Sequence, residues 1–214
     1  MSVLNQDRGS RLERLSSILA NPTAYLAYQY IVGGIRARQR CIRDHVRPAE
    51  SAVVLDIGCG PGYAVECFIR PRYFGFDISP QYIRHAKRKF GERVEFYCQY
   101  FDEQTLSWLP QVDIVLLMGV IHHMDDESVV QLLELAKRSM KPMGRLYTLD
   151  GCYQHEQSRI DRFFLETDRG KHVRGEAAYL KLVGKVFERV NGIIRKDLFF
   201  IPQTMLILEC MDRP

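Results

Sequence analysis

The stretch Val53-Val54-Leu55-Asp56-Ile57-Gly58-Cys59-Gly60-Pro61-Gly62 decides the fold class of this chain. Its first three residues form a short apolar run, which is typical of a strand buried on both faces. From Tyr63 onward, Val65, Phe68 and Ile69 follow a helical spacing. A glycine-rich turn between a strand and a helix can bring bare main chain close to a ligand, because glycine has no side chain and tolerates positive φ. The stretch therefore predicts a ligand-binding turn.

The spacing of the glycines indicates which ligand this turn binds. Dinucleotide-binding folds use G-x-G-x-x-G, whereas here the order is Asp56-x-Gly58-x-Gly60-x-Gly62, which is one residue tighter. A phosphate-binding P-loop would need a lysine after the glycines, and none follows. An isolated glycine loop is an ordinary turn, but this one lies between a buried strand and a helix, just after an acid. It resembles the first motif of class I S-adenosylmethionine-dependent methyltransferases.

The resemblance covers about residues 50–150 through recognisable motifs, and residues 176–211 only by the order of the elements. It implies that S-adenosylmethionine is the cofactor and S-adenosylhomocysteine the product. Carried over position by position, it implies cofactor contacts at Asp56, Gly58, Cys59, Gly60, Gly62, Asp77, Ile78, Tyr100, Met118 and Gly119.

Two of these positions carry alternatives. Asp77 ends the second predicted strand, one βα unit after Asp56, where a carboxylate can accept hydrogen bonds from both ribose hydroxyls. Taken alone, Asp77 would cap the helix predicted over 80–90; within the pattern we favour ribose binding. Family members often have an aspartate at the position of Tyr100, where it contacts the adenine amino group. Because this chain departs from that pattern, the adenine contact stays open among Tyr100, Asp102 and the main chain.

The chain alternates strands and helices from Val53 to Asp150, which predicts an α/β fold with a doubly wound parallel sheet. The resemblance adds a seven-stranded, mostly parallel sheet with an antiparallel C-terminal hairpin. The expected strands are 53–56, 73–76, 94–98, 112–118, 145–150, 193–200 and 204–211, and the expected helices are 63–69, 80–90, 126–140 and 176–190.

Two segments fall outside this core. Residues 1–47 are predicted to form an N-terminal helical lid segment ahead of a Rossmann-like domain at 48–214, with helices over 10–19, from Pro22, and over 35–46. The Gly33-Gly34 pair would hinge the last two helices, and a fixed packing helix is an equal alternative. Residues 151–175 are too long for a simple connection and are predicted to form a substrate-side insertion. A plain surface excursion is the rival interpretation.

Composition excludes several classes of protein. No apolar run reaches the roughly 18 residues that a membrane span needs, and the start lacks the apolar region of a signal peptide. The six cysteines show neither a C-x-x-C pair nor zinc-site spacing. We therefore expect a reduced, cytoplasmic protein without a metal site.

Charge gives a weaker signal. The net charge of +4 is too small to indicate a nucleic-acid-binding protein. Residues 1–50 hold eight arginines, no lysine and four acids, so they account for the whole excess. Such a face could bind phosphate or carboxylate bidentately, although we favour solvated helix faces.

The segment after the fourth predicted strand carries the candidate base. His122 and His123 follow Gly119 at the carboxyl end of that strand, where ligands bind in open α/β sheets. An oxygen or nitrogen acceptor that starts protonated needs a base, and histidine suits that task near neutral pH. We favour His123 as the catalytic base, with a purely structural pair as the alternative. Tyr28, His122, Tyr153 and His155 are candidates for lining the acceptor pocket.

The leading hypothesis is a methyltransferase that acts on an oxygen or nitrogen atom of a small molecule, such as a natural product, lipid or sugar. An RNA methyltransferase is the enzymatic alternative, favoured by the arginine-rich start, but the chain lacks an Asn/Asp-Pro-Pro-Tyr motif and a catalytic Cys-Pro pair. A non-catalytic cofactor-binding partner subunit is the third. The sequence leaves open whether the protein is a monomer or a homodimer.

Overall fold

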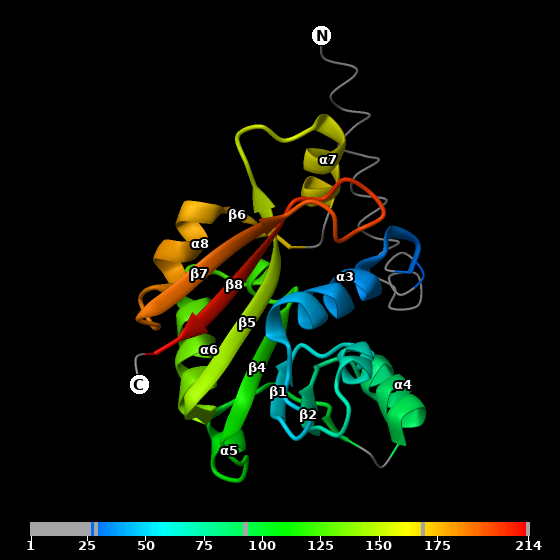
Figure 1. Ribbon diagram of the computed structural model, residues 1–214, viewed down its shortest axis with the longest axis vertical. Helices are drawn as coiled ribbons and strands as arrows, with labels where there is room; N and C mark the ends of the chain where they lie inside the picture. The colour runs from blue at the N-terminus through cyan, green and yellow to red at the C-terminus, as the bar shows by residue number, and fades with distance from the viewer. Residues whose placement is uncertain (1–26, 28–29, 92–93, 168–169, 213–214) are drawn as a thin grey trace.

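The computed structural model describes residues 27, 30–91, 94–167 and 170–212, which are built around one mixed sheet (Figure 1). Its strands lie in the order β3-β2-β1-β4-β5-β8-β7. Their bounds are β1 Val53–Ile57, β2 Arg72–Phe76, β3 Glu95–Tyr97, β4 Val112–Met118, β5 Met140–Tyr153, β7 Arg189–Arg195 and β8 Met205–Met211; the short β6, Arg174–Gly175, pairs with β5. The predicted α/β class and the mostly parallel sheet are confirmed.

The centre of the sheet is β1, which pairs in parallel with β2 on one side and β4 on the other. In its register, Leu55 lies opposite Phe74 of β2 and Val115 of β4. Strand order therefore reverses between β1 and β4, which is where open α/β sheets leave a crevice for ligands. At the far edge, β8 runs antiparallel between β5 and β7, which confirms the predicted C-terminal pair.

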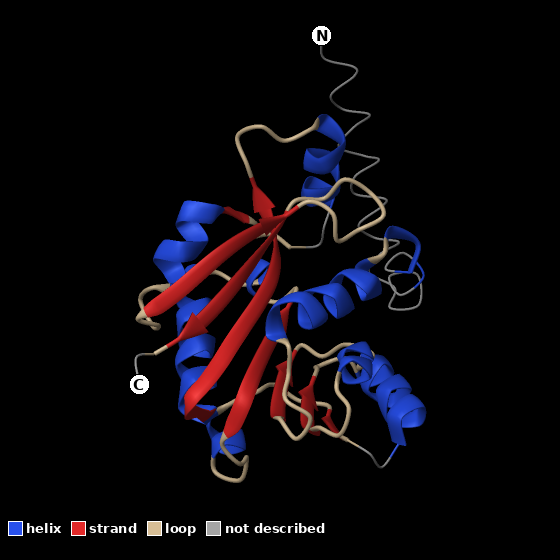
Figure 2. Ribbon diagram, in the orientation of Figure 1, coloured by secondary structure: helices blue, strands red, loops and turns tan. Residues whose placement is uncertain are grey.

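Helices cover both faces of the sheet (Figure 2). On one face, α3, a π-helix (η1) and α4 pack against Val54 and Ile114, whereas α6 and α8 pack against Leu55 and Val115 on the other. The bounds of the helices are α3 Gly34–Cys41, η1 Ile42–Val46, α4 Pro80–Phe90, α5 Glu103–Leu106, α6 Asp126–Ser139, α7 Arg159–Thr167 and α8 Glu176–Val183. None of the described helices is long and apolar enough to cross a membrane. All six cysteines are described, and each is a free thiol.

The fifth strand is longer than the predicted 145–150. It begins at Met140, directly after α6, and passes through Pro142. The register explains how a proline fits: Val112 pairs with Met140, but Ile114 pairs with Arg145, so β5 bulges there. A bulged segment needs no ladder hydrogen bond from its amide nitrogens, and proline is therefore tolerated.

Three predicted helices differ from those observed. The helix expected over 63–69 is a short 3-10 helix, Tyr63–Cys67, because Phe68 is already extended. The helix expected over 176–190 ends at Val183, where Gly184 forms the C-cap, and residues from Arg189 join β7. As a result, β7 lies four residues earlier than the predicted 193–200 and leaves 196–204 as a connection to β8.

The third difference lies in the predicted helix 35–46, which is α3 followed by the π-helix η1. Ala37, Cys41 and Ile42 are fully buried in the core on the α3 face of the sheet. This part of the predicted lid segment therefore packs as a core element. The helix expected over 10–19 lies outside the described residues. Of the helix expected from Pro22, only Ala27 and residues 30–32 are described, and all four are helical.

One ionisable pair is buried beneath α3. Asp56 is 2% exposed, and its Oδ2 accepts a short hydrogen bond from the Tyr73 hydroxyl. Its Oδ1 is buried and has no hydrogen-bond partner among the described residues. Burial raises the pKa of Asp56 to about 6, although the Tyr73 hydroxyl and the positive charge of Arg38 oppose that shift. Burial therefore makes ionisation of Asp56 harder in the folded protein than in the unfolded chain.

We predict that Gly62→Ala destabilises the fold more than Gly60→Ala. Both glycines have positive φ, which costs an alanine about 1–2 kcal/mol. A Cβ at Gly62 would also lie 2.8 Å from Phe96, whereas a Cβ at Gly60 would meet open space. Overpacking adds about 1–3 kcal/mol at position 62 only. Urea unfolding of the two variants measures the difference, and equal losses of stability would contradict it.

We also predict a pH-dependent gain of stability in Asp56→Asn. A carboxyl whose folded pKa is raised stabilises the fold at low pH, and that contribution disappears as the pH rises from about 4, the unfolded value, to about 6. Since asparagine cannot ionise, the unfolding free energy of the variant relative to wild type should rise by about 2–3 kcal/mol from pH 4 to pH 7. Urea titrations across this range test it; a constant difference is the contrary result.

Candidate functional site

A cavity of about 530 Å³ opens at the carboxyl ends of β1, β2 and β4. One wall comes from α3 and another from α6, so both faces of the sheet contribute. The described residues that line it are Ile35, Arg38, Ile57, Gly58, Gly60, Pro61, Tyr63, Phe76, Asp77, Ile78, Tyr82, Gln99, Tyr100, Phe101, Gly119, Val120, His123, Met124, Ser128, Gln131, Leu132 and Leu135.

The glycine turn forms the floor of this cavity. The amide groups of Gly58 and Cys59 both donate to the carbonyl oxygen of Phe76, at 2.8 and 3.0 Å, which ties the end of β1 to the end of β2. Gly58 has φ +74°, and a Cβ there would lie 2.6 Å from the Val120 side chain. Only glycine allows the main chain to lie this close to the segment after β4.

Asp77 lies where the first two βα units meet. Its Oδ2 accepts from the amide of Gly60 at 2.9 Å, and its Oδ1 accepts from the amide of Ser79 at 2.8 Å. Burial raises the pKa of Asp77, while these two backbone hydrogen bonds oppose the shift. The helix cap is Ser79, whose hydroxyl accepts from the amide of Tyr82. Asp77 is therefore not the cap of α4, and its carboxylate lines the cavity.

The segments after β2 and β3 form one end of the cavity. Ile78 and Tyr100 line it and are 58% and 73% exposed, so each offers an open apolar surface. Asp102 is not among the lining residues, because its carboxylate caps α5 through the amide and hydroxyl of Thr105.

The two histidines have different surroundings. His122 is buried, and its Nδ1 lies 2.7 Å from Oδ1 of Asp150, which also accepts from the His122 amide. His123 lies on the cavity wall, with its ring centroid 4.1 Å from that of His122. A fixed His122 therefore holds the neighbouring ring against the cavity.

The segment 170–175 makes hydrogen bonds to the loop that carries His122 and His123. The Arg174 guanidinium donates to the carbonyl oxygens of Ile121 and Met124 at 3.0 and 2.8 Å, and it pairs with Asp126 at 2.7 Å. The amide of His172 donates to the carbonyl oxygen of His122 at 2.9 Å. Part of the predicted 151–175 insertion thus contacts the loop that carries His123.

The structure brings some of the predicted site residues together and places others elsewhere. Of the predicted cofactor contacts, Gly58, Gly60, Asp77, Ile78, Tyr100 and Gly119 line the cavity, as does His123. Asp56, Cys59, Gly62 and Met118 do not line it, and all four are buried. His122, Tyr153 and His155 are likewise absent from the described lining, and Tyr28 lies outside the described residues.

Sequence reasoning missed several lining residues. Arg38 and Ile35 are three residues apart on α3, so a helical wheel could have put them on one face, but not against a cavity. Tyr63 directly follows the glycine motif, and its hydroxyl lies 2.5 Å from that of Tyr30. The α6 residues carried no local signal, since only the tertiary fold brings that helix to the site.

Comparison with known proteins agrees with this geometry. Residues 54–144 match the protein-family model for a methyltransferase domain. The N-terminal Xaa-Pro-Lys N-methyltransferase 1-B of Xenopus laevis is 25% identical over 122 residues, covering 54% of this chain and 55% of that protein. The tRNA U34 carboxymethyltransferase of Shewanella oneidensis is 31% identical over 88 residues, covering 38% of this chain and 27% of that protein. The chain thus spans about half the length, or less, of these relatives.

Solved structures show the same fold over most of the chain. A mitomycin 7-O-methyltransferase superposes with a TM-score of 0.62 at 20% identity, covering 94% of this chain and 60% of that one. Human N-acetylserotonin methyltransferase, in complex with S-adenosylmethionine, gives a TM-score of 0.62 at 18% identity, covering 96% and 56%. The glycine turn, the strand order and the family match agree: residues 54–144 of this chain are similar to a methyltransferase domain, and the chain has the fold of these solved methyltransferases.

Proposed function

We propose that the protein transfers the methyl group of S-adenosylmethionine to an oxygen or nitrogen atom of a small molecule, such as a natural product, lipid or sugar. The observation that carries this proposal is the convergence of the glycine turn, Asp77 and His123 on one cavity. Its volume of about 530 Å³ lies within the usual range for small-molecule sites.

The geometry supports a definite orientation of the cofactor. Asp77 would accept the ribose hydroxyls, because its carboxylate is held by two backbone amides and lines the cavity. Adenine would then lie between Ile78 and Tyr100, on the side of β3. The methionyl group would extend along the bare main chain of Gly58 and Gly60 toward Gly119, which brings the sulfonium near His123.

The reaction is an in-line displacement, so positioning of donor and acceptor supplies much of the acceleration. Bound S-adenosylmethionine would supply an electrophilic methyl group to a lone pair of the acceptor, and S-adenosylhomocysteine would leave with the bonding pair of the broken carbon–sulfur bond. His123 would take the proton that the acceptor loses. His122 would hold the loop through its contact with Asp150. The alternative is that His123 only packs against the substrates.

The rival acceptors are macromolecules. The two sequence relatives bear the names of a protein N-methyltransferase and a tRNA carboxymethyltransferase. The described lining of this cavity contains one arginine and no lysine, which favours a small acceptor over a polyanion. A non-catalytic partner subunit would bind the cofactor without turning it over.

The decisive experiment uses purified protein and S-adenosylmethionine labelled on the methyl group. Calorimetry with S-adenosylhomocysteine tests binding, and a panel of hydroxyl- and amine-bearing small molecules, a peptide beginning Xaa-Pro-Lys and bulk tRNA tests transfer. We expect label in a small molecule. Label in the peptide or in tRNA would show that the acceptor is a macromolecule and not a small molecule. Tight cofactor binding without any transfer would support the hypothesis of a non-catalytic partner subunit. No binding by folded protein would overturn the proposal.

We predict that Asp77→Ala lowers the affinity for S-adenosylhomocysteine by about 10- to 100-fold, the expected loss for hydrogen bonds to a charged group. Asp113→Ala is the matched control, since Asp113 lies at the other end of the sheet and pairs with Lys141. Calorimetry on both variants, with thermal melts to confirm folding, measures the change. Equal affinities for wild type and Asp77→Ala would exclude the ribose contact.

We predict that His123→Ala retains cofactor affinity but lowers turnover by about 100-fold, a typical size for a general-base contribution. His155→Ala serves as the control, because His155 is exposed and lies outside the described cavity lining. Initial rates with the identified acceptor measure the change. If His123→Ala turns over as fast as wild type, the residue is structural.

A further inference from the structure

Arg38 is the one arginine or lysine in the described lining of the cavity. It comes from α3, which precedes the matched segment 54–144. Its guanidinium lies beside Gly119, where a Cβ would be 3.4 Å from Nη2 of Arg38. Gly119 is at the end of the cavity that is opposite the β3 segment, so this cation is remote from the proposed adenine position.

The guanidinium of Arg38 makes no hydrogen bond or ion pair with the residues that the structure describes, unlike its neighbours on α3. Arg40 donates to the main-chain oxygen and the carboxylate of Asp197, at 2.6 and 2.8 Å. Arg36 lies over the ring of Phe200, 5.0 Å from its centroid. The helical spacing separates these side chains, so that 36 and 40 face the β7–β8 connection while Arg38 faces the cavity with Ile35.

The field of Arg38 reaches the two carboxyls at the glycine turn. Its positive charge opposes the upward pKa shifts of both Asp56 and Asp77. Neither carboxylate accepts a hydrogen bond from it: Asp56 accepts from Tyr73, and Asp77 accepts from the amides of Gly60 and Ser79. The site thus keeps a partly buried cation available to a ligand anion.

We infer that Arg38 binds the carboxylate of the methionyl group of the cofactor, an inference that rests on the function proposed above. S-adenosylmethionine carries one anionic group, at the end of the molecule opposite adenine. With ribose at Asp77 and adenine at Ile78 and Tyr100, that carboxylate lies on the Gly119 side of the cavity, beside Arg38. The planar guanidinium can hold it with two parallel hydrogen bonds.

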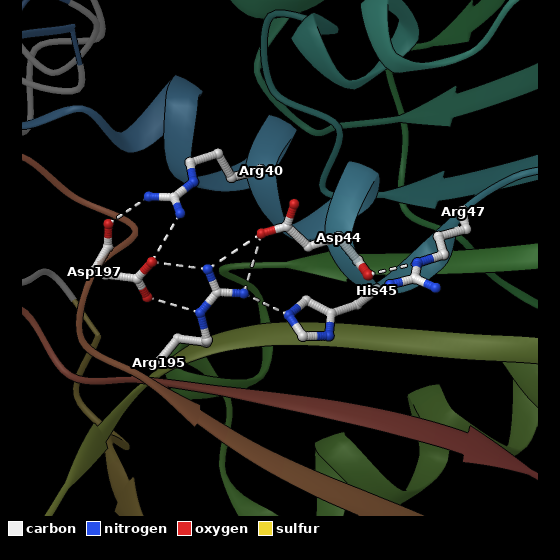
Figure 3. Close-up of polar contacts among 6 residues, drawn as sticks. All are labelled: Arg40, Asp44, His45, Arg47, Arg195 and Asp197. Carbon is white, nitrogen blue, oxygen red and sulfur yellow. Dashed lines mark hydrogen bonds and ion pairs between the residues drawn. The ribbon is translucent and has the colours of Figure 1, made fainter.

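A second group of residues sets the position of α3 and therefore of Arg38. Arg195, the last residue of β7, donates to both carboxylate oxygens of Asp197 at 2.7 and 2.9 Å and to Asp44 at 3.2 Å (Figure 3). Its Nη1 also lies 2.7 Å from Nε2 of His45. Asp44 and His45 belong to the π-helix that continues α3, and Arg40 reaches the same Asp197. Arg195 is therefore a positioning residue for the helix that carries Arg38.

The test compares two ligands that differ only in the carboxylate: S-adenosylhomocysteine and its decarboxylated analogue. Calorimetry on the wild-type chain should give about 10- to 100-fold tighter binding of S-adenosylhomocysteine. In Arg38→Met, the affinity for S-adenosylhomocysteine should fall close to that for the analogue, while the affinity for the analogue stays within about twofold of the wild-type value. Arg38→Lys should retain part of the ratio, because it keeps the charge but loses the bidentate geometry. Arg36→Met, on the same helix, should leave the ratio of the two affinities at its wild-type value.

Arg195→Met tests the positioning role. It should lower the affinity for S-adenosylhomocysteine less than Arg38→Met does, and adding it to Arg38→Met should cause no further loss, because the two changes act through one contact. Thermal melts confirm that each variant is folded. Additive losses, or equal losses for both ligands, would make Arg195 a general stabilising residue and contradict the positioning role.

The outcomes separate the two proposals. If the wild-type chain binds both ligands and Arg38→Met and Arg38→Lys leave their ratio unchanged, the assignment of Arg38 is wrong and the proposed function stands. An equal loss for both ligands in folded Arg38→Met also overturns it, since the side chain would then act on the cavity as a whole. If wild-type protein binds neither ligand, both proposals fall together.

Discussion

The hydrogen bond from the Gly60 amide to the Asp77 carboxylate joins the first two βα units at the floor of the cavity. It works together with the amides of Gly58 and Cys59, which both reach the carbonyl oxygen of Phe76. These bonds hold the glycine turn against the end of β2, where Gly58 and Gly60 line the cavity with main chain alone. The position of the other cavity walls is defined relative to this glycine turn.

The parts of the fold that follow from local patterns were predictable. Val54 and Leu55 belong to a short apolar run and are fully buried on opposite faces of the sheet. The position of Asp77 after β2 followed from the length of one βα unit, and the structure places its carboxylate on the cavity. The predicted ends of helices and strands were less accurate at residues that are compatible with more than one local structure. Pro142 lies in a bulge of β5, ahead of the predicted start at 145, and Gly184 ends a helix that apolar spacing alone would continue.

The rest of the site could not be predicted, because it depends on residues far apart in the sequence. Arg174 reaches the carbonyl oxygens of Ile121 and Met124 from some fifty positions away, and no local pattern marks that contact. The different surroundings of His122 and His123 depend on Asp150, which only strand pairing brings close. Arg38 belonged to a run of arginines that looked uniform, and only the packing of α3 separates it from Arg36 and Arg40.

The burial of α3 also bears on where this domain begins. The segment recognised by similarity begins at residue 54, yet Ala37, Cys41 and Ile42 already fill the core beneath the sheet. A truncated protein starting at that recognised edge would expose the apolar surface those residues cover and would remove one side of the cavity. The packed core therefore extends beyond the matched segment, and any domain swap designed in this chain has to carry α3 with the sheet.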